Sequence, residues 1–337
     1  MASDPGRRYD QMSSKAYEHP ADRAATSALR SIPLMDKAIK RLTHLAMERQ
    51  LHQMLVGNAV RIGEHQVPAL FASYQRCAIA LDIEPAPTLY ITQTPLANAM
   101  TVGAQRPVVL IYSGLAASYD ADEVQAILAH ELGHVLSEHY YYTTAFVLVA
   151  QMLTSSLPGG VTGLPVMALY MALLEWSRAA ELSSDRASAL VMDDPLTTCR
   201  MLMRMAGGAV EGMNLDAFIA QATEYEEEDD LFARWGRAMV ELTRTHPFAV
   251  RRVRELVAWV EAGDFDRIRS GSYVRRGSEP PPSAEFEAAV AHYRARFTST
   301  LERTTGGVQR LVSQLEDWFK GTDAHDGEDD ADAQGVS

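Results

Sequence analysis

Cysteine is scarce in this 337-residue chain, which has only Cys77 and Cys199. Two cysteines are too few for the disulfide framework of a small secreted protein. They lie in no paired-cysteine motif of the kind that binds zinc. We therefore interpret them as small buried hydrophobic residues rather than as metal ligands.

Basic residues are also few, since 31 Lys and Arg stand against 44 Asp and Glu and leave a formal net charge of −13. Binding to phosphates needs a dense basic surface, so this composition argues against a nucleic-acid partner. Part of the acidic excess lies in residues 224–230 and 323–332, which we expect to be solvated. Hydrophobic residues make up 47% of the chain, enough for a substantial core.

The first sixty residues lack an apolar run that resembles a secretory signal, so we expect a cytoplasmic protein. The longest uncharged stretch, residues 140–174, contains two apolar pieces, 143–157 and 164–174. Each piece is shorter than the roughly 20 residues that a spanning helix needs. Two core helices are the favoured interpretation, and a membrane-dipping hairpin with peripheral membrane contact is the alternative.

The remaining pattern predicts helices around a small sheet, an α+β fold that is predominantly helical. Residues 1–20 are polar and predicted to be disordered, and the apolar spacing over 21–84 is helical. The segments 88–92 and 108–112 are rich in β-formers and bounded by proline or glycine, so they predict strands, with a third strand at 98–102.

Composition also suggests how the chain is divided. We assign residues 85–278 to the core domain, which follows the N-terminal helical region. Consecutive prolines begin a linker and C-terminal helical appendage over 279–320. The acidic residues 321–337 are predicted to form a disordered tail.

A capped amphipathic helix is predicted to begin at Asp120. Glu123 stands three residues on, which is the spacing of a capping box. The apolar residues that follow recur at helical spacing. They are Val124, Ile127, Leu128, Leu132, Val135 and Leu136. The helix also carries the sequence His-Glu-Leu-Gly-His at residues 130–134.

Two histidines four residues apart lie on one face of a helix, so His130 and His134 can bind one zinc ion. Glu131 lies about 100° around the helix from His130, beside the metal face. That position suits a general base acting on a water that the metal activates. The alternative is a helix with two incidental histidines and a surface glutamate.

A catalytic zinc usually has three protein ligands and one open position. A third histidine ligand would be expected at the position that Tyr140 occupies, and His139 is one residue out of register and predicted to point elsewhere. A carboxylate remains, and Glu181 with Asp185 offers two acids four residues apart on a later helix. Glu181 could bind zinc while Asp185 accepts a hydrogen bond from a ligand imidazole. An ordinary charged helix surface explains the same spacing equally well.

At these residues the chain resembles the HtpX-like zinc metallopeptidases, the gluzincin group that also includes the CAAX prenyl proteases. The resemblance covers residues 85–256. Its elements, in order, are Asn98-Ala99, Tyr112-Ser113-Gly114-Leu115, the 130–134 motif, Glu181 with Asp185 and Ala187, and Thr245-His246-Pro247. The resemblance implies a zincin-like core with one zinc per chain.

The resemblance also implies roles for individual residues. It favours Glu181 as the third ligand and places His246 where it would stabilise the tetrahedral intermediate. The alternative for His246 is a surface residue before a helix. An extended substrate is expected to pair with the edge strand at Asn98, Ala99 and Met100, with affinity from main-chain bonds.

The predicted function is that of a zinc endopeptidase acting on protein or peptide substrates, with protein quality control as a role that the resemblance implies. A rival reading is a zinc-bound chaperone or scaffold whose terminal helices, 21–82 and 284–320, bind clients. A third reading is an enzyme at rest, with His246 or a loop side chain in the fourth zinc position. The sequence does not indicate an oligomeric state.

Overall fold

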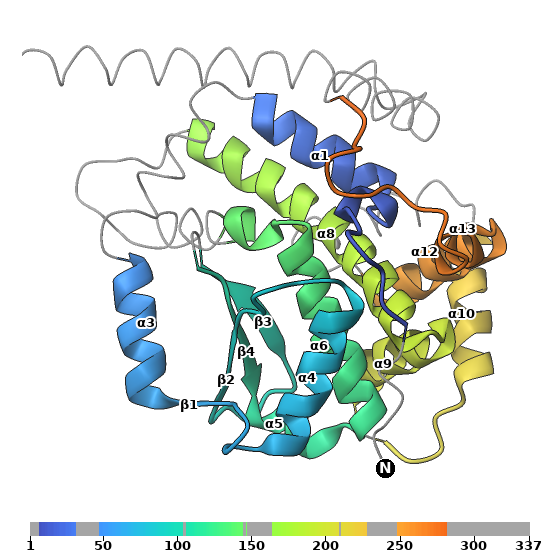
Figure 1. Ribbon diagram of the computed structural model, residues 1–337. Helices are drawn as coiled ribbons and strands as arrows, with labels where there is room; N and C mark the ends of the chain where they lie inside the picture. The colour runs from blue at the N-terminus through green and yellow to red at the C-terminus, as the bar shows by residue number, and fades with distance from the viewer. Residues whose placement is uncertain are drawn as a thin grey trace, which may run out of the picture.

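The computed structural model describes residues 7–31, 47–103, 106–143, 146, 164–208, 210–227 and 248–281 (Figure 1). The helices are η1 (Ser14–Ala16), α1 (Pro20–Ser31), α3 (Met47–Asn58), α4 (Pro68–Ala80), α5 (Ser113–Ser118), α6 (Ala121–Leu136), α8 (Leu164–Met192), α9 (Pro195–Gly207), α10 (Leu215–Glu227), α12 (Ala249–Glu261) and α13 (Asp264–Arg269). The strands are β1 (Ala59–Arg61), β2 (Thr88–Thr92), β3 (Ala99–Val102) and β4 (Val108–Tyr112). The predominantly helical α+β fold is therefore confirmed.

The strands form one mixed sheet in the order β1-β2-β4-β3. Strands β2 and β4 are parallel, whereas β1 and β3 run antiparallel to their neighbours. The three predicted strands are present. Strand β1 was missed, because a three-residue segment has no periodicity of its own and is defined by its pairing with β2.

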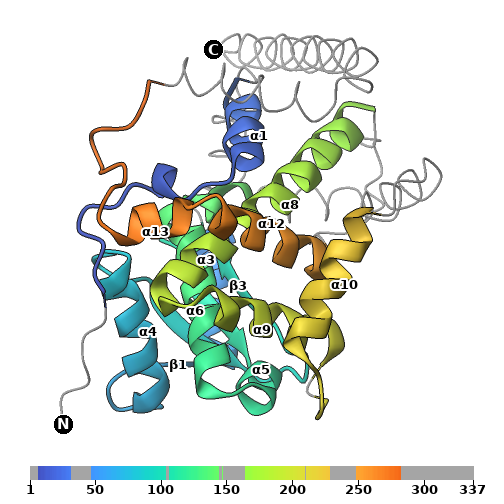
Figure 2. The same ribbon diagram turned by 90° about the vertical axis from the view of Figure 1, so that its right-hand side faces the viewer.

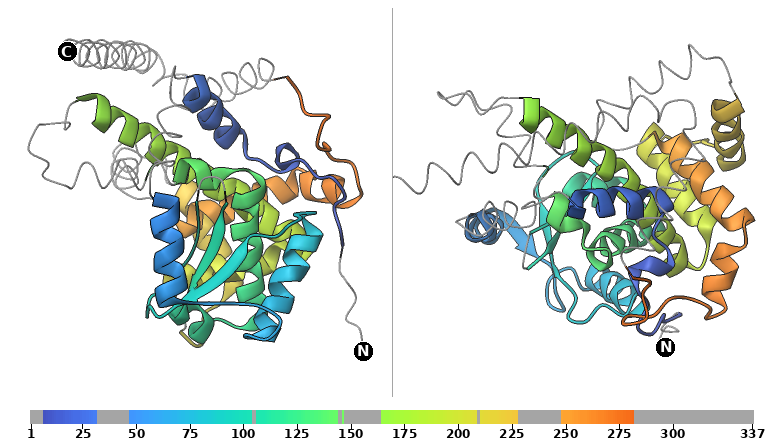
Figure 3. Two further views of the ribbon diagram at one scale, coloured as in Figure 1. Left: turned by 60° about the vertical axis from the view of Figure 1, so that its left-hand side comes forward. Right: turned by 90° about the horizontal axis from the view of Figure 1, so that it is seen from above.

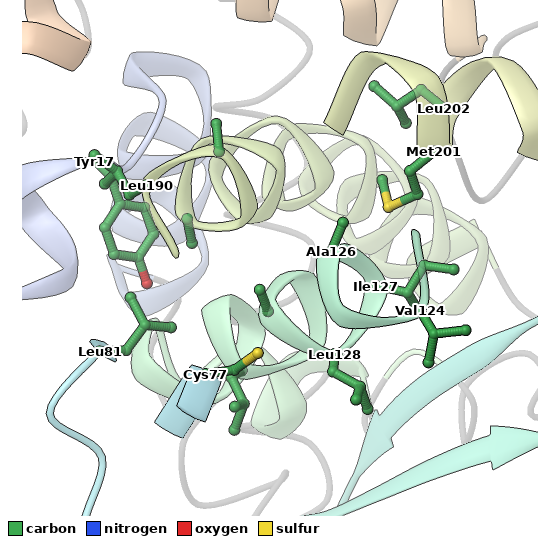
Figure 4. Packing of buried hydrophobic residues seen from close by; sticks show 14 of the residues in the cluster. Tyr17, Cys77, Leu81, Val124, Ala126, Ile127, Leu128, Leu190, Met201 and Leu202 are labelled. Atoms are coloured by element: carbon green, nitrogen blue, oxygen red, sulfur yellow. The ribbon is translucent and has the colours of Figure 1, made fainter. Parts of the chain in front are cut away.

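Helices cover both faces of the sheet (Figure 1). Helix α3 packs on one face, where Leu55 meets Tyr90 and Leu110 in a small cluster. The main core lies on the other face, between the sheet and helices α4, α6, α8 and α9. In it, Cys77 of α4 and Leu128 of α6 lie close to the sheet, with Leu190 of α8 beyond them (Figure 4). Helix α6 is thus surrounded by protein, and the side chains along it are largely buried.

Both cysteines are buried and free, as their interpretation as small hydrophobic residues requires. Cys77 belongs to the main core on α4, and Cys199 belongs to it on α9. Burial raises the pKa of each thiol to about 12, so both stay protonated and apolar.

The prediction of disorder for residues 1–20 is wrong from residue 7 onward. Tyr9, Met12 and Tyr17 are fully buried in the main core, so this segment contributes to it despite its polar composition. After α13, residues 274–276 run beside this N-terminal segment (Figure 2). There the main-chain N–H of Ser13 donates to the carbonyl oxygen of Val274. The burial of these two tyrosines and one methionine attaches the segment to the core.

Helix α8 joins two features that the sequence had suggested were separate. The apolar piece 164–174 and the acids of the later helix belong to one 29-residue helix, along which α1 packs (Figure 3). Leu173, Leu174 and Trp176 are buried, as expected of a core helix. Residues 147–157 of the first apolar piece lie outside the described residues. Among those described, no helix has the length and apolar character needed to cross a membrane.

Candidate metal centre

The histidine motif lies in the second half of α6, which begins as the sequence predicts. The Asp120 side chain accepts from the Glu123 main-chain N–H at 2.8 Å, and the Glu123 carboxylate accepts from the Asp120 N–H at 3.0 Å. This capping box fixes the first turn. It thereby sets the rotation at which His130, Glu131 and His134 face the rest of the protein.

Gly133 lets helix α8 come unusually close to the motif. A Cβ atom at this position would lie 2.7 Å from the Cβ of Ala187 and 3.2 Å from the Cα of Ser184, both on α8. Ordinary contacts between carbon atoms begin near about 3.5 Å. Glycine is therefore needed here for close helix packing, and that packing brings the acids of α8 against the histidines of α6.

The structure brings His130, His134 and Glu181 into one cluster, as the sequence suggested. Their nearest side-chain nitrogen and oxygen atoms all lie within 4.8 Å of one another. The two imidazole Nε2 atoms are 3.1 Å apart, and they lie 3.5 and 3.4 Å from the two carboxylate oxygens of Glu181. All three residues are largely buried.

These separations fit a tetrahedral metal ion. Zinc bound to nitrogen and oxygen at about 2.0–2.1 Å holds neighbouring ligand atoms roughly 3.3 Å apart. The two imidazole nitrogens, 3.1 Å apart, each lie near a different oxygen of the Glu181 carboxylate, so the three side chains together surround a position that such an ion could occupy. Among the described residues, no fourth His, Cys, Asp or Glu belongs to this group. Two imidazoles and one carboxylate are also a donor set that suits zinc.

Asp185 lies behind His130, as the sequence suggested. Its Oδ1 atom is 3.1 Å from His130 Nδ1, so it can accept a hydrogen bond from the N–H group at that nitrogen. The other ring nitrogen, Nε2, then carries no proton and faces the cluster. Arg252 of α12 donates to both oxygens of Asp185, at 2.6 and 2.8 Å, and lies 3.0 Å from Glu181. One buried guanidinium thus contacts both Glu181 and Asp185 of α8.

Sequence reasoning missed Arg252. It is one of several arginines in α12 and therefore resembles a surface charge. A signal was nonetheless present, since Arg252 lies four residues before Leu256 and beside Val253, on the face of α12 that is buried. An arginine on the apolar stripe of an amphipathic helix indicates a buried anion as its partner.

The electrostatics of the cluster favour a cation. Burial works against the charged form of His130, but hydrogen bonds to Asp185 and Glu181 raise its pKa to about 9. Burial lowers the pKa of His134 to about 4, and the neighbouring charge of His130 acts in the same direction. Burial also opposes ionisation of Asp185, yet the charge of Arg252 holds its pKa below the usual value. One positive charge is thus stabilised between the carboxylates, but two imidazolium groups are not.

Glu131 is held beside the cluster by the edge strand of the sheet. The Thr101 hydroxyl of β3 lies 2.7 Å from Glu131 Oε2 and 3.2 Å from the Glu131 carbonyl oxygen. A hydroxyl has a single proton, so the shorter contact to the carboxylate takes it. The residues predicted to bind substrate come just before Thr101 in the chain: Asn98 precedes β3, and Ala99 and Met100 are its first two residues.

His139 is not part of the metal cluster, as the sequence predicted, but it contacts His134 from behind. His139 is buried just beyond the C-terminus of α6, and its Nδ1 atom lies 2.9 Å from Nδ1 of His134. Its Nε2 atom lies 2.9 Å from Oδ2 of Asp22 on α1. The register argument holds for a helix, but α6 ends at Leu136 and Glu138 has a positive φ of 58°, which redirects the chain. The remaining predicted residue, His246, lies outside the described residues.

Comparisons with known proteins agree with this geometry. Residues 64–260 match the model of peptidase family M48. The chain is 31% identical over 271 residues to the plastoglobule-localized metallopeptidase 48 of Arabidopsis thaliana, a match that covers 78% of each protein. It is 28% identical over 224 residues to a protease HtpX homolog of Moorella thermoacetica, covering 59% of this chain and 74% of that protein. No solved structure gives a significant match.

Proposed function

Because the chain belongs to peptidase family M48 and is therefore a metallopeptidase, we propose that it is a zinc endopeptidase with His130, His134 and Glu181 as its metal ligands. The observation that carries the proposal is the clustering of these three side chains from α6 and α8, with one potential ligand atom from each lying within 4.8 Å of the others. A zinc ion held there supplies a Lewis acid and lowers the pKa of the water it binds to roughly 7.

Glu131 acts as the general base in this proposal. Its carboxylate accepts a proton from the attacking water and later delivers that proton to the leaving amine. The hydrogen bond from Thr101 fixes Oε2, so the orientation of the carboxylate is set before substrate binds. The sequence resemblance assigns His246 to the developing oxyanion, where an imidazole N–H would donate a hydrogen bond.

The substrate is proposed to bind in extended form along β3. This strand is at the edge of the sheet, and Asn98 accepts from the main-chain N–H of Tyr112 in β4. Hydrogen-bonding directions alternate along an antiparallel strand, so the main-chain groups of Ala99 and Thr101 point to the open side. A peptide chain pairing there gains affinity from its backbone, whatever its side chains.

The same strand therefore supports both substrate and base. Thr101 offers its main chain to the open edge, and its side chain contacts Glu131. A peptide paired with Ala99 and Thr101 would pass close to Glu131, the proposed base for the water that attacks the peptide carbonyl carbon. Such binding selects for unfolded or extended segments, since a folded strand already has its main-chain partners.

The test is hydrolysis of an unfolded protein such as casein by the wild-type chain, Glu131→Gln and His134→Ala. We expect Glu131→Gln to keep stoichiometric zinc and lose hydrolysis, and His134→Ala to lose both. Glu211→Gln makes the same chemical change at an exposed position and is the matched control, with unchanged zinc content and activity.

Mass spectrometry of the products identifies the kind of peptidase. Internal cuts in casein are expected from an endopeptidase, whereas single residues released from one end would contradict that part of the proposal. Turnover by Glu131→Gln at the wild-type rate would rule out Glu131 as the base, while its zinc content would still report on the ligands.

A further inference from the structure

A chain of three buried side chains connects the metal centre to the N-terminal helix. His134 of α6 contacts His139, Nδ1 to Nδ1, at 2.9 Å. His139 in turn contacts Oδ2 of Asp22 on α1 through its Nε2 atom, also at 2.9 Å. His139 and Asp22 are only 2% and 1% exposed, so water does not compete for these contacts.

Only one placement of the protons satisfies this chain when His134 is a metal ligand. A ligating Nε2 atom carries no proton, so the neutral imidazole of His134 has its proton on Nδ1. His139 Nδ1 must then accept a hydrogen bond from this N–H group, so the neutral ring of His139 carries its own proton on Nε2. That nitrogen donates to Asp22, whose ionised carboxylate can only accept. The direction of each hydrogen bond is therefore fixed: His134 donates to His139, and His139 donates to Asp22.

The structure holds Asp22 in place for this contact. Ser183 of α8 donates to Oδ2 of Asp22 at 2.6 Å, and Thr26 donates to Oδ1 at 3.2 Å. The hydroxyl of Ser183 also accepts from the main-chain N–H of His19 at 2.9 Å. Trp176 completes the enclosure, since it donates to Thr26 at 3.0 Å and its ring lies edge-on to His139.

The two histidine ligands are thus supported in different ways. His130 contacts its carboxylate, Asp185, directly at 3.1 Å. His134 reaches its carboxylate through an intervening imidazole. A carboxylate behind a ligating histidine fixes the ring and its tautomer and increases the basicity of the ligating nitrogen. An imidazole that donates to Asp22 can pass part of this effect to His134, because hydrogen bonds in a chain polarise one another.

We propose that His139 and Asp22 are positioning residues of the metal centre, which orient His134 and strengthen its bond to the metal. The proposal rests on the assignment of His134 as a ligand. It gives residues 7–31 a role in metal binding, although they precede the 64–260 segment that matches the family model. The N-terminal segment is then a functional part of the site rather than an appendage to it.

The experiment measures zinc affinity by competition with a chromophoric chelator, so that its result does not depend on peptidase activity. Asp22→Ala and His139→Phe are expected to weaken zinc binding about 10–100-fold. The double variant should bind zinc as tightly as the single variant with the lower zinc affinity, because both changes interrupt the same chain of contacts. Asp22→Asn, which keeps an acceptor but loses the charge, should fall between Asp22→Ala and wild type.

Tyr17→Phe is the matched control. The Tyr17 hydroxyl donates to the Gly133 carbonyl oxygen at 3.1 Å, so its loss also removes a buried hydrogen bond between the N-terminal segment and α6. It touches no ligand side chain, and zinc affinity should stay within twofold of wild type. Visible spectra of the cobalt-substituted proteins add a second measurement, since His139→Phe should shift the ligand-field bands and Tyr17→Phe should not.

The possible failures are distinguishable. If His134→Ala keeps its zinc, the ligand assignment is wrong and the inference fails with it. If His134→Ala loses zinc while Asp22→Asn and His139→Phe bind it with wild-type affinity, the positioning role alone is refuted. Additive losses in the double variant would also refute it, because they would indicate two independent packing defects. Should Asp22→Ala not fold, Asp22→Asn and His139→Phe still decide the question.

Discussion

The close packing at Gly133 makes a quantitative prediction about Gly133→Ala. The added Cβ would lie 2.7 Å from that of Ala187, so α6 and α8 would have to separate by roughly 1 Å to restore an ordinary contact. Overpacking of this kind costs about 1–3 kcal/mol, while alanine gains about 1 kcal/mol over glycine inside a helix. The net loss of stability is therefore small, about 0–2 kcal/mol.

Metal binding should suffer far more than stability. Glu181 moves with α8, so the 3.4–3.5 Å distances between its oxygens and the histidine nitrogens would increase to more than about 4 Å. At that separation one zinc ion can no longer reach all three side chains at its ideal bond lengths. We expect zinc affinity to fall tenfold or more, and activity with it, since a 1 Å misplacement can cost about 100-fold in rate. Chelator competition and thermal unfolding of the metal-free protein measure the two effects separately.

A swap of the two small residues provides the control. Gly133→Ala combined with Ala187→Gly removes the 2.7 Å clash and leaves only the 3.2 Å approach to the Cα of Ser184. The double variant should recover most of the zinc affinity, whereas Ala187→Gly alone should keep it and lose about 1 kcal/mol of stability. Wild-type zinc affinity in Gly133→Ala, or no recovery in the swap, would refute the reasoning.

Three further predictions concern the surrounding polar groups. Arg252→Met removes the guanidinium that contacts Glu181 and Asp185, so the free energy of unfolding in urea should fall by about 3–5 kcal/mol in the zinc-free protein. The fall should be smaller in the zinc-bound protein, and equal falls would contradict this reasoning. Thr101→Val should lower kcat about tenfold through the lost hydrogen bond to a charged group, at unchanged zinc content, and an altered zinc content would argue for a merely structural role. Burial opposes ionisation of Asp22, but His139 and the hydrogen bonds to the Asp22 carboxylate lower the pKa of Asp22 to about 2. The ionised carboxylate therefore stabilises the fold above about pH 4, and this contribution disappears as the pH falls toward 2. In metal-free protein, Asp22→Asn should remove this part of the acid sensitivity, about 2 kcal/mol, and an unchanged pH profile of unfolding would count against it.

The motif helix and the spacing of its two histidines could be predicted because their signals are local. The capping box of Asp120 and the four-residue spacing of His130 and His134 depend only on helix geometry, and both are present. The third donor was harder to find. Spacing left Glu181 no better than a surface acid, and only the resemblance to the HtpX-like family favoured it.

The residues that sequence reasoning missed owe their positions to tertiary structure. His139 was excluded by helical register, which ceases to apply once α6 ends at Leu136. Asp22 lies at the start of the region predicted only to be helical, and its partners Ser183 and His139 are more than a hundred residues away. Arg252 was hidden among the arginines of α12. Contacts across such distances have no periodic signature, so they become visible only when the helices are packed.

The span of the network has a consequence for how the protein is made. The groups around the proposed ion extend from Asp22 on α1 to Arg252 on α12, so the last of them leaves the ribosome only when most of the chain has been synthesised. Until α12 docks, Glu181 and Asp185 lack their contacts with Arg252. The surroundings of the metal ligands are therefore completed late in synthesis, after the ligands themselves have been made.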